Sequence, residues 1–164
     1  MLTIIGGLPA TGKTTIARTL AREVGAVHLR IDTIEQAIVR CGFGQQPLGP
    51  IGYDIGYALA ADYLRQGLSV VAESVNPLEV TRSAWRAAAA GFPVVDVEIV
   101  CSDPIEHRRR AETRVLDIPD LKPPTWEQIV NREYEPWTTE RVVLDTAGLP
   151  VEDCVAELRK ALSP

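Results

Sequence analysis

Gly7-Leu8-Pro9-Ala10-Thr11-Gly12-Lys13-Thr14 is the most informative stretch of the sequence, because it has the form G-x-x-x-x-G-K-[ST]. The two glycines permit backbone angles that other residues resist, so the loop can turn its N–H groups inward around a phosphate. Lys13 is expected to reach the β- and γ-phosphates of a nucleotide, and the Thr14 hydroxyl is expected to supply an oxygen to Mg²⁺. We call residues 7–14 the phosphate loop.

The segments on either side of the phosphate loop support this interpretation. Residues 2–5 are an apolar run that predicts a strand, and residues 14–24 carry apolar side chains at helical spacing. A chance glycine-rich turn is the alternative, but it would not require a strand before it and a helix after it. The expected nucleotide-binding residues are therefore Gly7, Leu8, Pro9, Ala10, Thr11, Gly12, Lys13, Thr14 and Thr15. We expect Thr15 to take part as a first-turn helix residue and not as a side-chain ligand.

Short apolar runs alternate with helix-period segments along the rest of the chain, which is typical of a parallel α/β sheet. The expected strands are 2–5, 27–31, 68–72, 94–101 and 142–144. The expected helices are 14–24, 33–39, 53–65, 78–90, 104–115, 125–133 and 151–162. The sequence thus predicts one domain, 1–164, with a five-stranded parallel sheet sandwiched by helices. Ligands are expected beyond the carboxyl ends of the strands.

Composition narrows the possible partners and the expected compartment. The chain has 164 residues and a net charge of -5, which disfavours a broad electrostatic grip on a nucleic-acid backbone. Its three cysteines are widely spaced, so neither a disulfide framework nor a zinc site is expected. No signal-peptide pattern and no stretch long enough to span a bilayer is present, so we expect a soluble cytoplasmic protein.

Three further segments follow the phosphate loop in a set order. They are Leu29-Arg30-Ile31-Asp32, Ala72-Glu73-Ser74-Val75-Asn76-Pro77 and His107-Arg108-Arg109-Arg110-Ala111-Glu112-Thr113-Arg114. With the phosphate loop they resemble the small P-loop kinases related to polynucleotide kinase, chloramphenicol phosphotransferase, zeta toxin and gluconate kinase. The resemblance covers nearly the whole chain. It implies a P-loop NTPase fold and phosphoryl transfer from ATP to a hydroxyl under a small helical lid, but it does not identify the acceptor.

Asp32 stands at the expected end of the second strand. In the resembling kinases an aspartate in this setting receives the proton of the acceptor hydroxyl, and it could also bind a water on Mg²⁺. The alternative is an ordinary N-cap, since a helix is expected to begin at Thr33. Arg30 lies two residues earlier on the same sheet face, where it could bind substrate or be a solvated rim arginine.

Glu73 and Asn76 follow the third strand, at the edge where the pocket is expected. Glu73 fits the place of the acidic residue associated with Mg²⁺ in many P-loop proteins, where the family pattern often has Asp. The longer side chain would act on the metal through water, or touch the substrate. Asn76 is a candidate substrate contact, and the alternative is that Asn76-Pro77 is only a turn.

Arg110 and Arg114 are spaced i, i+4 on the arginine-rich helix. In the resembling kinases such arginines begin a lid, here roughly residues 108–135, and clamp the transferring phosphoryl group. The alternative is a solvated helix face with surface ion pairs. After the fifth strand, Thr146 and Gly148 are expected to contact the nucleotide, and the preference for ATP over GTP rests on the resemblance.

The leading hypothesis is an ATP- and Mg²⁺-dependent kinase of a small hydroxylated molecule or a nucleic-acid 5′-end. The acceptor pocket is expected near the loop 41–51, which carries Gln45 and Gln46. A second hypothesis is a regulatory ATPase that works through a protein partner, which an exposed apolar patch near the lid would favour. A third is a binding module without turnover.

Overall fold

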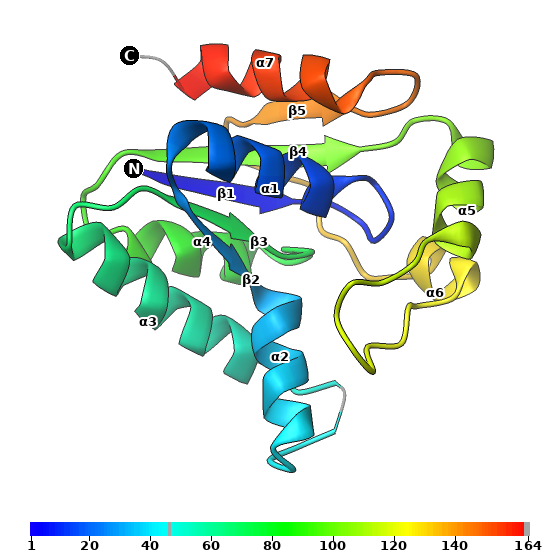
Figure 1. Cartoon of the computed structure of the whole chain (residues 1–164), viewed down its shortest axis with the longest axis horizontal. Coiled ribbons are helices and arrows are strands. Elements are labelled where there is room, and N and C mark those ends of the chain that lie inside the picture. The colour runs from blue at the N-terminus through cyan, green and yellow to red at the C-terminus, as the bar shows by residue number, and fades with distance from the viewer. Residues whose placement is uncertain (46, 163–164) are drawn as a thin grey trace.

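A single sheet of five parallel strands forms the centre of the protein, in the order β2-β3-β1-β4-β5 (Figure 1). The computed structural model describes residues 1–45 and 47–162. The strands are β1 (Leu2–Gly6), β2 (Val27–Arg30), β3 (Val70–Glu73), β4 (Val94–Val100) and β5 (Val142–Asp145). The predicted α/β fold with a five-stranded parallel sheet is confirmed.

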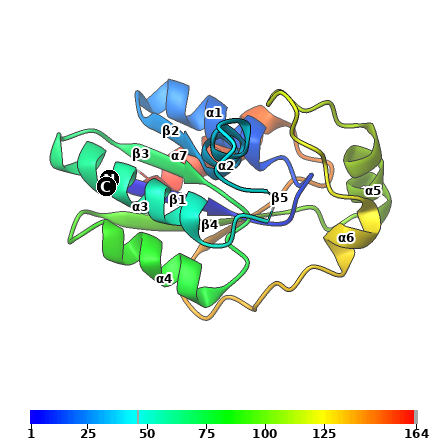
Figure 2. The same cartoon turned by 90° about the horizontal axis from the view of Figure 1, so that it is seen from below.

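Helices cover both faces of the sheet (Figures 1 and 2). The helices α1 (Lys13–Val24) and α7 (Val151–Leu162) pack on one face, and α3 (Ile51–Arg65) and α4 (Glu79–Ala88) pack on the other. The three remaining helices, α2 (Ile31–Arg40), α5 (Pro104–Thr113) and α6 (Trp126–Val130), stand at the carboxyl ends of the strands (Figure 1). None of the helices described is long and apolar enough to cross a membrane.

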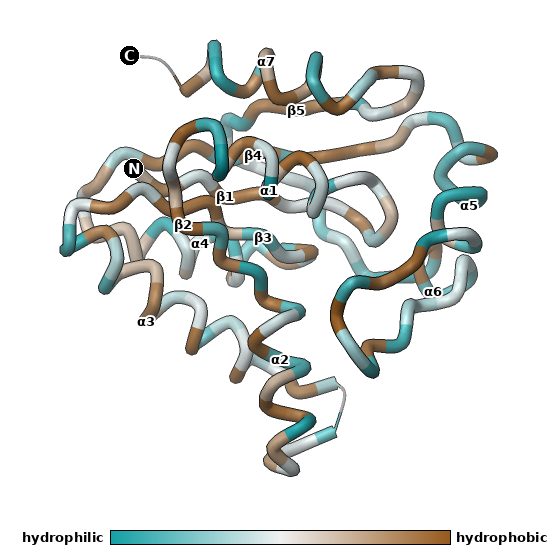
Figure 3. The backbone as a smooth tube through the Cα atoms, viewed as in Figure 1, coloured by the Kyte–Doolittle hydropathy of each residue, from teal (hydrophilic) through white to brown (hydrophobic). Residues whose placement is uncertain are grey.

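The hydrophobic core is split between the two faces because neighbouring strand residues point to opposite sides. In β1, Ile5 joins the cluster under α1 and α7, while Ile4 joins the cluster over α3 and α4. Both side chains are fully buried. Figure 3 shows the brown, hydrophobic strands at the centre and the largely hydrophilic α5 beyond them. The polar residues at the strand ends are therefore the ones left to form a site.

The start of α2 differs from the prediction. The strand β2 ends at Arg30, and the helix begins at Ile31 without an intervening loop. Arg30 is the N-cap, and no side chain caps this terminus. Asp32 is therefore neither the last strand residue nor the N-cap. It lies in the first helical turn, where the helix dipole favours a carboxylate.

Side chains cap both α5 and α6, and α5 is shorter than predicted. The Asp103 carboxylate accepts hydrogen bonds from the backbone N–H groups of Ile105 and Glu106, and Thr125 forms a capping box with Gln128. The helix α5 ends at Thr113, and Arg114 has extended backbone angles, φ −65° and ψ 138°. Arg114 is the C-cap, and its N–H still donates to the carbonyl oxygen of Arg110, so Arg110 and Arg114 lie one turn apart at the end of α5.

A buried arginine of α4 holds the segment that follows α6, residues 131–137, which we call the strap. Arg82 is 0 % exposed and donates hydrogen bonds to the carbonyl oxygens of Glu135 and Pro136, at 2.7 and 3.2 Å. Its guanidinium also lies 4.2 Å from the ring centre of Trp137. Since a buried arginine needs its donors satisfied, these contacts fix the strap to α4.

Candidate active site

A cleft of about 1210 Å³ opens at the carboxyl ends of β1, β2 and β3. The phosphate loop forms its floor, and α2 with residues 47–49 forms one wall. The opposite wall comes from α5, α6 and the connection between them, residues 114–125, which we call the lid loop. Figure 1 shows the lid loop reaching from α5 and α6 toward α2. The cleft lies where ligands bind in open α/β sheets.

Two glycines shape the phosphate loop as its motif requires. Gly7 has φ 140°, and a Cβ atom there would lie 2.2 Å from the carbonyl oxygen of Ile99. No side chain fits at that position. Gly12 has φ 97° and is the N-cap of α1, so the loop passes directly into a helix N-terminus. Lys13 lies over the loop, with its Nζ donating to the carbonyl oxygen of Leu8 at 2.7 Å.

The predicted nucleotide-binding residues take different positions in the cleft. Those that line it are Pro9, Ala10, Gly12, Lys13, Thr14, Thr15 and, from the loop after β5, Thr146. Gly7, Leu8 and Thr11 are not part of the lining and can contribute through their backbone. Gly148 has a positive φ of 75° and also lies outside the lining. Gln46 lies outside the described residues, and its neighbours Pro47, Leu48 and Gly49 line the cleft.

Burial lowers the pKa of Lys13 from 10.5 to about 8. The negative charges of Glu73 and Asp32 act in the opposite direction, while Arg114 and Arg132 add to the lowering. The lysine is therefore held in a place that disfavours its own charge. A polyphosphate on the loop would supply the missing negative charge.

We expect nucleotide binding to take up a proton at high pH. Above about pH 8 Lys13 is mostly neutral, and bound phosphates favour its charged form, so binding raises the pKa of Lys13. The expected result is uptake of about one proton at about pH 9, little uptake at about pH 7, and an affinity that falls as pH rises above 8. Calorimetry in buffers of different ionisation enthalpy measures this. Equal proton uptake at both pH values would contradict the assigned environment of Lys13.

Glu73 connects the phosphate loop with β2. Its Oε1 accepts a hydrogen bond from the Thr14 hydroxyl, and its Oε2 lies 2.9 Å from Nε2 of His28. Burial raises the pKa of Glu73, but the hydrogen bonds from His28 and Thr14 and the charge of Lys13 outweigh it, so the pKa is lowered. Glu73 is thus an ionised carboxylate beside the Thr14 hydroxyl.

The residues around Thr14 fit the Mg²⁺ that the fold implies. A hydroxyl and a carboxylate in hydrogen-bond contact are hard oxygen donors of the kind that Mg²⁺ prefers. Within residues 1–45 and 47–162, no group of three or more His, Cys, Asp or Glu side chains could hold a metal ion. The ion would therefore depend on nucleotide phosphates and waters for its other ligands, as P-loop proteins use it.

Arg30 is buried in an ion network. Its side chain is only 10 % exposed, and Nη1 donates to Oδ1 of Asp117 at 2.7 Å. Oxygens of Asp32 and Glu73 lie 3.8 and 4.0 Å from the guanidinium. Arg18 of α1 also donates to Asp117. Asp117 thereby ties the lid loop to α1 and to the end of β2. Arg30 is therefore not a solvated arginine at the rim of the sheet.

We expect Asp117→Asn to loosen the lid loop. The change removes the negative charge of Asp117, which pairs with Arg18 and Arg30. The hydrogen bond from Arg30, helped by the one from Arg18, lowers the pKa of Asp117 to about 2. Amide hydrogen exchange in the lid loop should become about three- to tenfold faster, because local opening costs less free energy. Asp120→Asn in the same loop is the control, since Asp120 has φ 65°, which Asn tolerates. Equal exchange in the two variants would show that Asp117 does not hold the loop.

The two predicted arginines face different ends of the cleft. Arg110 donates from Nη1 to the Thr146 hydroxyl at 2.8 Å and from Nη2 to the Thr146 carbonyl oxygen at 2.9 Å. Arg114 lies near Asp32, whose charge raises the pKa of Arg114, although burial is the larger influence and lowers it. Arg110 therefore lies at the end of the cleft beside β5, and Arg114 lies at the end beside α2.

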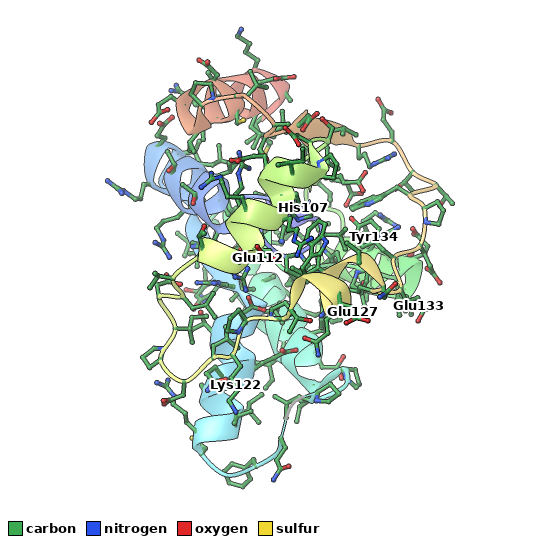
Figure 4. All side chains as sticks on the ribbon, turned by 90° about the vertical axis from the view of Figure 1, so that its right-hand side faces the viewer. His107, Glu112, Lys122, Glu127, Glu133 and Tyr134 are labelled. Atoms are coloured by element: carbon green, nitrogen blue, oxygen red, sulfur yellow. The ribbon has the colours of Figure 1, made fainter. Side chains whose placement is uncertain are left out.

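Sequence reasoning missed Arg132 and Lys122. Both line the cleft from the lid side, and the charge of Arg132 is close enough to Lys13 to lower its pKa. Figure 4 shows Lys122 on the lid loop, and His107 between α5 and α6. Nε2 of His107 lies 2.8 Å from the carbonyl oxygen of Pro9, and the ring packs edge-on against Trp126. His107 thus joins the lid helices to the phosphate loop.

Two predictions concern residues outside the centre of the cleft. Asn76 is 0 % exposed and does not line the cleft, and its backbone N–H donates to the Tyr53 hydroxyl. Its position gives no support to the expected substrate contact. Arg108 and Arg109 form exposed ion pairs with Glu112 and Glu106, as expected for a solvated helix face.

Comparisons with known proteins agree with this geometry. The sequence profile of the family described as AAA domain matches residues 2–132. The fold is shared with a candidate kinase from Chloroflexus aurantiacus J-10-fl (22% identity, TM-score 0.77, covering 98% of this chain and 94% of that chain). The fold is also shared with a gluconokinase from Sinorhizobium meliloti 1021 (16% identity, TM-score 0.66, covering 98% of this chain and 94% of that chain). Chaetomium thermophilum Kti12, solved in complex with ADP-AlF3, has the same fold (20% identity, TM-score 0.67, covering 100% of each chain).

A search of curated proteins finds no match. The solved kinase structures confirm, at the level of the fold, the resemblance to small P-loop kinases.

Proposed function

This chain belongs to the AAA domain family. We propose that it is an ATP- and Mg²⁺-dependent kinase. It transfers the γ-phosphoryl group to a hydroxyl of a small molecule or of a nucleic-acid 5′-end. One observation carries the proposal: the Lys13 ammonium, the Thr14–Glu73 pair and the Asp32 carboxylate line one cleft. A nucleotide-binding module alone would not need a carboxylate at the acceptor side of the phosphate loop.

Each group has a role in this proposal. The loop amides and Lys13 hold the phosphates, while Thr14 and Glu73 serve the metal ion, which when bound neutralises phosphate charge. The acceptor oxygen forms a bond to the γ-phosphorus as the bond to ADP breaks, and its proton passes to Asp32. Arg114 lies beside Asp32, where it would stabilise charge on the transferring group.

An acceptor screen tests the kinase proposal. Mg·ATP is offered with sugars, polyols, nucleosides and 5′-hydroxyl oligonucleotides, and ADP release is measured. We expect at least one acceptor class to raise ADP release well above the rate without acceptor, with a phosphorylated product visible by mass spectrometry. Release that no acceptor stimulates would contradict the proposal.

A second candidate function is a regulatory ATPase that acts through a protein partner. Exposed apolar side chains lie on the lid loop and on the loop after α2: Val115 is 95% exposed and Phe43 is 84% exposed. A protein partner could cover these two side chains, and a contiguous apolar patch that includes them would mark its binding surface. Slow, acceptor-independent hydrolysis would favour this function over the kinase.

A further inference from the structure

The Glu73 carboxylate is held from two sides, by Thr14 and by His28. Its Oε1 accepts the hydrogen bond of the Thr14 hydroxyl, and its Oε2 lies 2.9 Å from Nε2 of His28 on β2. Since Glu73 is ionised and has no proton to give, Nε2 of His28 is the donor in this contact. The proposed function assigns roles to Thr14 and Glu73 but gives none to His28.

The pairing of β2 with β3 places His28 beside Glu73. In the parallel register Arg30 is paired with Glu73, and His28 is paired with Val71 two residues earlier. Side chains two residues apart on a strand point to the same face of the sheet. That face is the one covered by α1, because Val71 belongs to the core cluster under this helix. The sheet itself therefore directs the imidazole at the carboxylate.

Arg30 is a competing partner for the same carboxylate oxygen. Its Nε lies 4.0 Å from Oε2 of Glu73, which is too far for a hydrogen bond. In the part of the chain that the structure describes, this buried Nε has no hydrogen-bond partner. Without a donor at His28, a turn of the carboxylate toward Arg30 would satisfy both groups. The same turn would draw the carboxylate away from Thr14.

We propose that His28 is a positioning residue for magnesium binding, which holds the Glu73 carboxylate toward Thr14. His28 is not among the described residues that line the cleft. It lies in the wall of a second cavity of about 360 Å³, which α1, β2, α2 and the lid loop enclose. Groups that orient a metal ligand in this way commonly contribute about ten- to a hundredfold to metal affinity. This inference rests on the Mg²⁺ dependence of the proposed function.

Two amide variants test the hydrogen bond separately from the polarity of the side chain. His28→Gln places an amide donor near the position of Nε2, whereas His28→Asn is one methylene shorter and carries the same amide out of reach of Glu73. Mg²⁺ is titrated into the ADP-bound protein in a calorimeter, and ADP affinity is measured separately in EDTA. We expect His28→Gln to keep Mg²⁺ affinity within about threefold, and His28→Asn to weaken it about tenfold or more. ADP affinity in EDTA should be unchanged in both variants.

Three further variants serve as controls. His28→Leu has no donor, so it should match His28→Asn, and it replaces that variant if the asparagine prevents folding. Arg40→Leu alters another side chain in the wall of the second cavity and should change neither affinity. In a Glu73→Gln background the His28 variants should no longer differ, because no carboxylate remains to be oriented.

Equal Mg²⁺ affinity in His28→Gln and His28→Asn would overturn the inference, whether that affinity is weak or strong. A loss of ADP affinity in EDTA that accompanies the loss of Mg²⁺ affinity would also overturn it, because His28 would then support the fold of the site and not the carboxylate. Mg²⁺ affinity that no His28 variant changes ends only this inference. ADP binding by the natural chain that is indifferent to Mg²⁺ ends the proposed Mg²⁺ dependence and the inference together.

Discussion

Lys13→Ala is expected to abolish ATP turnover and to weaken ATP binding sharply. The Lys13 ammonium lies over the loop that holds the phosphates, and its burial makes its electrostatic contribution large once a triphosphate binds. We expect turnover to fall at least about a thousandfold, the scale on which a charge clamp on the phosphoryl group acts. Equilibrium binding of ATP and steady-state ADP release measure the two effects.

A lysine outside the site provides the control. Lys160→Ala on α7 makes the same substitution at an exposed position and should leave both quantities unchanged. The assignment of the phosphate loop would be wrong if Lys13→Ala kept the ATP affinity and turnover of the natural chain. A variant of lower thermal stability but unchanged affinity would point to the same conclusion.

Asp32→Asn is expected to reduce phosphoryl transfer by roughly a hundredfold or more, the usual scale of a positioned acid–base group. The amide keeps the shape of the side chain but cannot receive the proton of the acceptor hydroxyl. ATP affinity should stay within about twofold, because Asp32 lies on α2 and not in the phosphate loop. Single-turnover measurements with an acceptor found in the screen separate transfer from binding.

The control for this change is Asp54→Asn, which removes a carboxylate from the first turn of α3. It should transfer phosphate at the rate of the natural chain. Because Arg30 is the N-cap of α2, loss of a capping hydrogen bond does not explain a defect of Asp32→Asn. Undiminished transfer by Asp32→Asn would remove Asp32 from the mechanism.

The phosphate loop and the positions of the strands along the chain were predictable because their signals are local. The motif 7–14 is contiguous, and each strand is an apolar run that needs only its own neighbours to be seen. The start of α2 was not predictable in the same way. The strand passes into the helix without a loop and without a side-chain cap, so neither a turn residue nor an N-cap marked Ile31 as the first helical residue.

The parts of the site that sequence reasoning missed depend on contacts between distant segments. Asp117 is separated by 99 residues from Arg18 and by 87 from Arg30, and no motif connects them. His28 offered a weaker signal, since it alternates with Arg30 on the strand paired with β3 beside Glu73. The predicted helix through residue 115 was too long, because no glycine or proline marks its end after Thr113.

We expect the predicted lid, residues 108–135, to close when nucleotide binds, and the contacts at both ends of this segment favour a narrower moving part. His107 holds α5 to the phosphate loop, and Arg82 holds the strap after α6. The lid loop between them is held through Asp117, whose side chain is about half exposed, so its ion pairs are weaker ties than the buried contacts on either side. We therefore expect the lid loop to move more than the helices that flank it.

The buried Arg82 also bears on the order in which a newly made chain can assemble. Its partners at 135 and 136 follow it by 53 and 54 residues, so during synthesis the N–H groups that bind them must stay hydrated until the strap emerges. The four strands that carry the phosphate loop and the Glu73 pair all lie within residues 2–100 and can assemble earlier. On the ribosome, the phosphate loop would therefore fold before the strap is fixed to α4. The cleft of a partly synthesised chain would then be open on the side of the lid loop.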